Sequence, residues 1–86
     1  MYRISFKPSF IRQYNKLEED LKIEVLDKIE LLKNKANHRK IKVHRLHGRL
    51  SGNWSFSINY KIRVVFEFIS KEEIVVLAIG DHAVYQ

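Results

Sequence analysis

The sequence predicts an α+β domain in which one strand and two helices precede four strands of a mainly antiparallel sheet. Three patterns support this prediction. Residues 2–6 alternate apolar and polar side chains, residues 10–32 repeat apolar side chains at helical spacing, and residues 54–79 hold three runs rich in β-branched and aromatic residues. Because paired helices must bury their apolar stripe against one face of a sheet, we expect a two-layer sandwich. With 86 residues, we expect one domain spanning 1–86.

The first half carries clear signals for a strand and a helical pair. Tyr2, Ile4 and Phe6 alternate with polar residues, and Pro8 suits the first turn of a helix. The acidic step at 18–20 suits the start of a second helix, where negative side chains meet the positive end of the helix dipole. The apolar stripe expected on this second helix is Leu21, Val25, Ile29 and Leu32, widened by Leu26. The residues expected to face solvent are Lys22, Glu24, Asp27, Lys28 and Glu30. The short connection predicts an antiparallel helical hairpin.

The second half alternates strand patterns with turn residues. The expected strands span 42–46, 54–58, 62–69 and 74–79, and Gly80 ends the last of them. The expected connections are a basic loop at 34–42, a turn at 48–53, a tight hairpin or a bend near the strand's end at 59–61, and a hairpin at 70–73. The helices then cover one face of the sheet, and we expect the opposite face to be open to solvent.

Composition excludes several classes of function. The chain has no cysteine, which rules out disulfides and thiolate metal sites, and its four histidines lack the spacing of a zinc motif. We therefore expect no metal and no cofactor. No glycine-rich phosphate loop, paired catalytic carboxylates or serine triad stands out. No apolar stretch approaches the length of a membrane span, and we expect a cytoplasmic protein that does not contact membranes.

The net charge of +6 is unevenly distributed. Six of the ten acidic residues lie between Glu18 and Glu30, whereas the segment from Lys33 to Arg63 holds nine lysines or arginines and no acid. Such a segment suits a polyanion such as RNA or an acidic protein partner. The alternative is an ordinary solvated lysine-rich face. The aromatic and histidine residues interleaved with these charges favour a nucleic-acid or partner surface.

Arg63 is the first candidate for chemistry. It lies in an otherwise apolar strand, so its side chain is expected on the face opposite to Val64 and Phe66. A guanidinium fixed on a strand keeps its charge and can hold a phosphate at two points. The structural alternative is a salt bridge to Glu67 on the same face.

His82 and Tyr85 follow the last strand. Histidine titrates near neutral pH, so His82 can take a proton from a ribose hydroxyl or give one to a leaving oxygen. Tyr85 can stack on an unpaired base. The alternatives are a surface histidine and a tyrosine that anchors the chain end against the sheet.

His47 is a second candidate for proton transfer, since it lies between two arginines just before a turn. His44 is the weaker candidate, and His38 is expected to be solvated in the basic loop. Trp54 and Phe56 are expected in the core rather than as base-stacking residues. The candidate RNA- or phosphate-binding residues are Lys42, Arg45, Arg49 and Lys61.

These residues carry a family resemblance. The order of elements, the segment LHGRLSGNWSFSINYKIRVVFEF and the ending LAIGDHAVY together resemble the RelE/ParE superfamily of bacterial toxins, nearer its RelE and YafQ branch. The resemblance covers nearly the whole chain. It implies a RelE-like sandwich and a toxin that cleaves mRNA at the ribosome by attack of a 2′-hydroxyl on the adjacent phosphate.

The resemblance also implies roles and partners. Arg63 matches the strand arginine that stabilises the transition state, His82 matches a catalytic arginine or histidine, Tyr85 matches a terminal aromatic, and His47 approximately matches a basic residue before the turn. The implied partners are mRNA, the ribosome and an acidic cognate antitoxin, which could form a hetero-oligomer with the toxin.

Two features depart from the family pattern. Ser55 and Ser57 replace the strand lysines of RelE, so a lysine proton shuttle is absent there. The middle-strand histidine and aspartate of YafQ also have no clear counterpart. Two alternatives therefore stay open, a ParE-like inhibitor of DNA gyrase without nuclease activity and a degenerate member that only binds its antitoxin.

Overall fold

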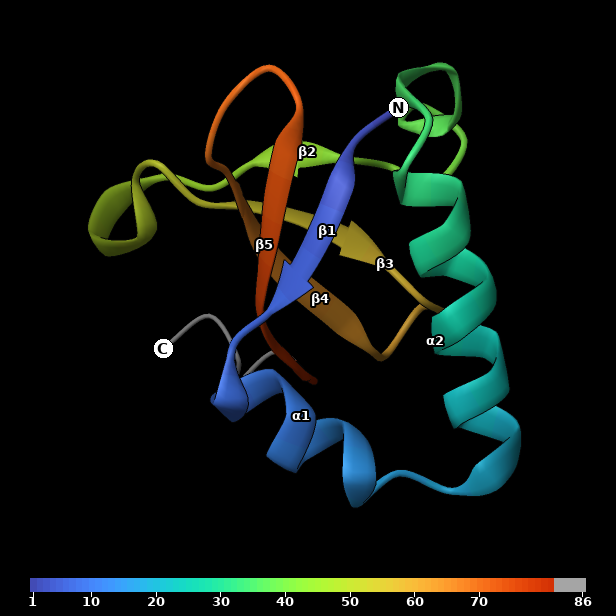
Figure 1. The fold of residues 1–86 in the computed structure, drawn as a ribbon. Coiled ribbons are helices and arrows are strands. Elements are labelled where there is room, and N and C mark those ends of the chain that lie inside the picture. The colour runs from blue at the N-terminus through green and yellow to red at the C-terminus, as the bar shows by residue number, and fades with distance from the viewer. Residues whose placement is uncertain (82–86) are drawn as a thin grey trace.

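The computed structural model describes residues 1–81 of the chain. The elements are β1 (Arg3–Phe6), α1 (Pro8–Asn15), α2 (Glu19–Leu32), β2 (His44–Arg45), β3 (Trp54–Ser57), β4 (Arg63–Phe68) and β5 (Glu73–Gly80). Two single-turn 3-10 helices, Lys35–Asn37 and Gly48–Leu50, interrupt the second half. The predicted α+β class is confirmed (Figure 1).

The strands form one mixed sheet of order β1-β5-β4-β3-β2. β1 runs parallel to β5, with Ile4 opposite Ile74, and the other neighbours are antiparallel. The connection between this parallel pair contains both helices and the strands β2, β3 and β4. The first strand therefore lies beside the last one, and the basic middle segment supplies the other side of the sheet.

The helices enclose the core against one face of this sheet. Figure 1 shows α1 across the lower end of the sheet and α2 rising along its side. Pro8 opens α1 without losing a needed hydrogen bond, and Glu19 and Asp20 lie in the first turn of α2 as expected. The fully buried side chains at the centre include Val25, Leu32, Phe56, Val64 and Phe66. The core therefore lies between α2 and the β3–β4 pair.

The solvent-facing side of α2 differs from the prediction. Leu26, expected to widen the buried stripe, is 52% exposed. Lys22, Glu24 and Lys28, expected to face solvent, are half-buried instead. Lys22 lies over the Tyr14 ring, and the Lys28 ammonium donates to the carbonyl oxygen of Ile58 at 3.1 Å. Long lysine stems can lie along apolar surface while their charged ends find polar partners.

The segment before β3 also differs from the prediction. The strand expected over 42–46 shrinks to His44–Arg45, because Lys42 adopts a left-handed backbone with φ 62°. His38 is half-buried rather than solvated. Its ring stacks on Tyr2 at 5.6 Å between centroids, and its Nε2 lies 2.8 Å from the carbonyl oxygen of Leu32.

The second face of the sheet is less open than expected. Ser55, Val65 and Val75 lie on the face opposite the helices, yet their exposed fractions are 0%, 4% and 8%. Toward the start of β4, however, Ser57 and Arg63 are only half-buried. This face is therefore closed at its centre and accessible toward its margins, where Ser5 and His44 are exposed.

Neither helix within residues 1–81 combines the length and the apolar character needed to cross a membrane.

The core position of Phe66 gives a test of this packing. Replacing Phe66 by alanine removes a fully buried ring and should lower the free energy of unfolding by about 3–5 kcal/mol. Urea denaturation followed by circular dichroism measures this change. The control is Tyr60→Ala, since that ring is 89% exposed and its loss should change stability by less than about 0.5 kcal/mol. Similar losses for the two variants would contradict the described core.

Candidate functional site

The turn between β3 and β4 is built around one side chain. Asn59 accepts hydrogen bonds at its Oδ1 from the backbone N–H groups of Lys61 at 2.9 Å and Ile62 at 2.7 Å. The N–H of Ile58 donates to the carbonyl oxygen of Ile62 at 2.9 Å. An asparagine that satisfies two turn donors fixes the local backbone. The residue that follows, Arg63, therefore leaves a rigid support.

Arg63 is held by this turn through neutral acceptors. Its Nη1 donates to the carbonyl oxygen of Asn59, and a longer contact of 3.4 Å reaches the carbonyl oxygen of Ile62. Glu67, the alternative partner considered from the sequence, forms no ion pair with Arg63 within residues 1–81. A carbonyl orients a guanidinium without neutralising it, so the positive charge stays available to an anion.

Arg63 lies at a pocket of about 310 Å³ between the sheet, α2 and the loop before β2. The lining residues are Lys28, Lys40, Ile41, Lys42, Ser57, Ile58, Asn59, Tyr60 and Arg63. Four of these side chains are cationic, and none is a carboxylate. The cations come from α2, from the loop and from β4, which brings distant parts of the sequence together. We call this the Arg63 pocket.

His44 is not among the residues that line the Arg63 pocket, although it lies on the same face of the sheet as Arg63. In the sheet register it is opposite Ser55, and Ser57 is opposite Arg63, so His44 and Arg63 share the second face. Strand spacing puts their Cα atoms on the order of 12 Å apart. The His44 Nδ1 lies 2.9 Å from the carbonyl oxygen of Lys42 and must donate to it, which leaves Nε2 free to accept a proton.

His47 lies away from this pocket. Arg45 is opposite Trp54, and the N–H of Leu46 donates to Asn53, so His47 lies beyond the Trp54 end of β3. Arg63 lies at the other end of that strand. The structure thus places His44 two strands from Arg63 on the same face of the sheet and leaves His47 exposed beyond the opposite end of β3.

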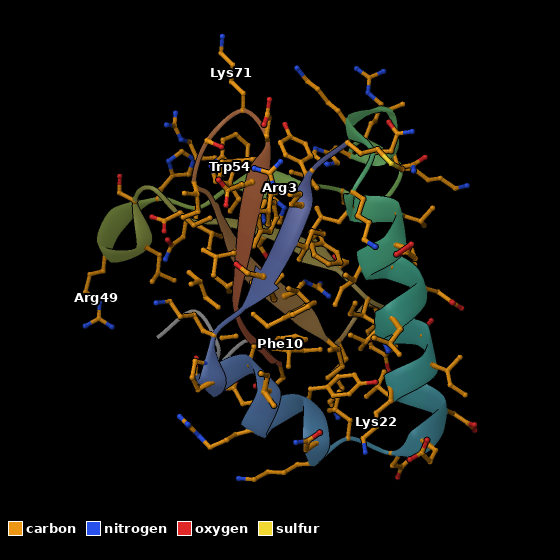
Figure 2. The ribbon with its side chains drawn as sticks, in the orientation of Figure 1. Arg3, Phe10, Lys22, Arg49, Trp54 and Lys71 are labelled. Atoms are coloured by element: carbon orange, nitrogen blue, oxygen red, sulfur yellow. The ribbon has the colours of Figure 1, made fainter. Side chains whose placement is uncertain are left out.

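The predicted phosphate-binding residues divide between the two ends of β3. Lys42 lines the Arg63 pocket, and the exposed Lys61 lies in the adjoining turn. Arg45 instead lies over the Trp54 ring at 5.6 Å, and Arg49 points outward from the tip of the 48–52 loop (Figure 2).

The other sequence candidates have different outcomes. His82 and Tyr85 lie outside the described residues, so their proposed roles stay predictions. Trp54 and Phe56 are core or half-core residues, as expected, with Trp54 packed edge-on against Phe68. Within residues 1–81, no three histidine, aspartate or glutamate side chains gather as potential metal ligands.

The site residues chosen from the sequence did not include Lys28, Lys40 and Tyr60 of the Arg63 pocket, although Tyr60 is one of the aromatic residues interleaved with the basic ones. The position of Lys28 could have been predicted from helical spacing. It follows Val25 by three positions and precedes Leu32 by four, which places it on the buried flank of α2. Tyr60, which is 89% exposed, is an aromatic residue at a turn tip, where packing does not require one. No sequence pattern identified Lys40 as a pocket residue, apart from its position in a basic loop.

The arrangement suits a phosphate group. A pocket with four cations and no carboxylate attracts an anion, and Arg63 offers a fixed guanidinium for bidentate contact. The exposed Tyr60 ring at the rim can stack on a base. The free Nε2 of His44 can exchange a proton with a group bound over the second face.

Comparison with known proteins relates this fold to bacterial toxins. No family model and no curated protein matches the sequence. Among solved structures, the YoeB–YefM complex from Staphylococcus aureus matches with a TM-score of 0.75 at 19% identity, over 95% of this chain and 98% of that one. YafQ from Escherichia coli strain BL21(DE3) matches with a TM-score of 0.71 at 11% identity, over 99% and 98% of the two chains.

A third solved structure extends the comparison to another complex. The toxin–antitoxin complex RelBE2 from Mycobacterium tuberculosis matches with a TM-score of 0.71 at 17% identity, over 94% of this chain and 98% of that one. The resemblance found in the sequence is therefore confirmed for the fold, which is that of RelE/ParE-type toxins along nearly the whole chain.

Proposed function

We propose that the protein is the toxin of a toxin–antitoxin pair and that it cleaves mRNA on the ribosome. The observation that carries this proposal is the Arg63 pocket, in which four cations and no carboxylate surround a guanidinium held by neutral acceptors. The toxin fold supports the same function. The proposed setting is the cytoplasm.

The proposed reaction is an internal transfer at one phosphate of the RNA. The 2′-oxygen of a ribose forms a bond to the adjacent phosphorus, and the bond from phosphorus to the 5′-oxygen of the next nucleotide breaks. The products are a cyclic phosphate and a 5′-hydroxyl end. Negative charge grows on the phosphate oxygens in the transition state, and Arg63 with the pocket lysines offsets it.

Two proton transfers accompany this reaction. We assign removal of the 2′-hydroxyl proton to His44, because its Nε2 is free and its ring is held by the carbonyl of Lys42 beside the Arg63 pocket. His82 then donates a proton to the leaving 5′-oxygen, and Tyr85 stacks on a base. These last two roles rest on the sequence pattern and the family resemblance. His47 is left out, because it lies at the far end of β3 from Arg63.

His44 and His47, which are close in the sequence but lie at different distances from Arg63, provide a matched test of this assignment. His44→Gln should slow mRNA cleavage about 100-fold, within the usual contribution of general acid–base catalysis, while His47→Gln should change it less than about threefold. Arg63→Gln should cost about 100-fold or more. Cleavage is measured by mapping mRNA ends in a purified translation system, and His82→Ala should abolish growth arrest in cells.

Two results would contradict the proposal. If His47→Gln slows cleavage and His44→Gln does not, the assignment of proton transfer is wrong. If the unmodified protein stalls gyrase supercoiling while mRNA stays whole, the nuclease function itself is wrong.

We also propose an acidic antitoxin as the partner, forming a hetero-oligomer with this chain. The net charge of +6 requires an acidic complement, and a shallow apolar groove offers the contact area. The residues lining that groove are Phe6, Phe10, Ile11, Tyr14, Asn15 and Leu26. Its Ile11 and Leu26 are 46% and 52% exposed, which is costly for a surface that stays uncovered. The solved YoeB–YefM and RelBE2 assemblies contain toxin and antitoxin together.

The apolar groove can be tested with one substitution on α2. Leu26→Glu should weaken antitoxin binding about tenfold or more by placing a charge in an apolar contact. The control is Ile69→Glu, because Ile69 is similarly exposed at 55% but lies outside the groove. Calorimetric titration with the product of the neighbouring reading frame, where we expect the acidic antitoxin, measures both. Equal affinities for the two variants would place the antitoxin elsewhere.

A further inference from the structure

A second pocket lies at the other end of the sheet from Arg63. Its volume is about 540 Å³, and it is formed by the start of the chain, the loop before β2, and the β4–β5 hairpin. Four aromatic or heteroaromatic side chains line it: Tyr2, His38, Trp54 and Phe68. Phe68 ends β4 and Arg63 begins it, so strand spacing separates the two pockets by about 17 Å. We call this the aromatic pocket.

The walls of the aromatic pocket support one another. Phe68 packs edge-on against Trp54 with centroids 5.1 Å apart, and it lies 5.5 Å from the Tyr2 ring, which in turn stacks on His38. Each of these rings is only half-buried, so part of its surface is open. Rings held by mutual packing lose little freedom when a planar ligand binds.

A cationic pocket adjoins the aromatic one. It holds about 200 Å³ and shares Tyr2, Lys35 and Lys71 with its neighbour. Lys33 at its edge is engaged by Glu30 at 2.6 Å. Lys35 and Lys71 are exposed and form no ion pair within residues 1–81. Lys71 lies at the tip of the β4–β5 hairpin (Figure 2). Neither pocket is lined by a carboxylate.

We propose that these two pockets together bind a nucleotide. Its base lies against the aromatic rings, and its phosphate lies between Lys35 and Lys71. The pairing of an aromatic pocket with a cationic one favours a ligand that joins a planar ring directly to an anion. An acidic peptide would supply the charge, but it offers a planar group only where an aromatic side chain happens to fall. The nucleotide can be free or part of an RNA strand. This inference does not depend on mRNA cleavage at the Arg63 pocket.

The chain contains a single tryptophan, Trp54, which makes its fluorescence a direct probe of the aromatic pocket. Adenosine 5′-monophosphate should quench this fluorescence, and the dissociation constant from the titration should be at least tenfold lower than that of adenosine or of ribose 5-phosphate. Adenosine lacks the phosphate, and ribose 5-phosphate lacks the base. A tetra-adenylate RNA in the same assay distinguishes the source. Tighter binding of the RNA by tenfold or more identifies a strand as the ligand, and equal binding identifies a free nucleotide.

Paired substitutions test the proposed phosphate contact. Lys35→Gln with Lys71→Gln should weaken nucleotide binding about tenfold or more, and thermal melting checks that the fold is kept. The control pair, Lys7→Gln with Lys16→Gln, removes the same charge from exposed positions outside both pockets and should leave affinity unchanged.

Three outcomes would overturn the inference. They are unchanged fluorescence with both nucleotide and RNA, equal losses for the two lysine pairs, and quenching by an acidic peptide but not by nucleotide. The last would identify the surface as a peptide site. None of these outcomes bears on mRNA cleavage, which is measured separately with the Arg63 and His44 variants.

Discussion

The hydrogen bond from the Arg63 guanidinium to the carbonyl oxygen of Asn59 sets the character of the functional site. Asn59 is itself fixed by two backbone donors of the same turn, so the arginine is oriented by a rigid and neutral support. Arg3 provides the contrast within the same sheet, because Glu72 and Glu73 lie 3.4 and 3.5 Å from its guanidinium. An arginine paired with carboxylates is already neutralised, whereas Arg63 keeps its charge for an external anion.

The uneven distribution of acids makes this arrangement possible. No aspartate or glutamate occurs between Leu31 and Phe66. This segment supplies the loop before β2, the strands β2 and β3, and the turn that leads to Arg63. Glu19 and Asp20 lie in the first turn of α2, where they stabilise the helix. Lys28 crosses from that helix into the Arg63 pocket and adds a fourth cation. The fold thus gathers cations from α2, the loop before β2 and β4 around one pocket that no carboxylate lines, and such a pocket suits a polyanion.

Much of the fold could be predicted from the sequence, because an element that is buried on one side has apolar residues at a regular spacing. The stripe at Val25 and Ile29 and the β-rich run at Val64 and Phe66 each identified their element and its buried face. The alternation around Ile4 identified its strand, but Phe6 on the expected buried face is 39% exposed. The backbone conformation of a single residue produces no such repeating pattern. The left-handed φ of Lys42, which shortens β2, could not be predicted from the residue type. The exposure of Leu26 depends on the path of α1, which no local pattern records.

The candidate site was predicted only in part for a related reason. Arg63 was identified because a charge within an apolar strand is conspicuous, but its partners depend on the turn and on the neighbouring loop. The choice between His44 and His47 required the register of β2 against β3, which puts His44 on the same face as Arg63 and His47 beyond Trp54. The cations of Lys28 and Lys40 reach the pocket only through tertiary packing. The roles of His82 and Tyr85 still rest on the sequence alone.

The most direct test of the account is the salt dependence of RNA binding, because each phosphate contact by a cation releases counterions from the strand. A 2′-O-methylated single strand binds without being cleaved, so its affinity can be measured from low to moderate salt. The account predicts that Arg63→Gln lowers the slope of log affinity against log salt by about 0.7, while Arg3→Gln leaves the slope unchanged. An unchanged slope for Arg63→Gln would contradict the claim that this guanidinium holds a phosphate.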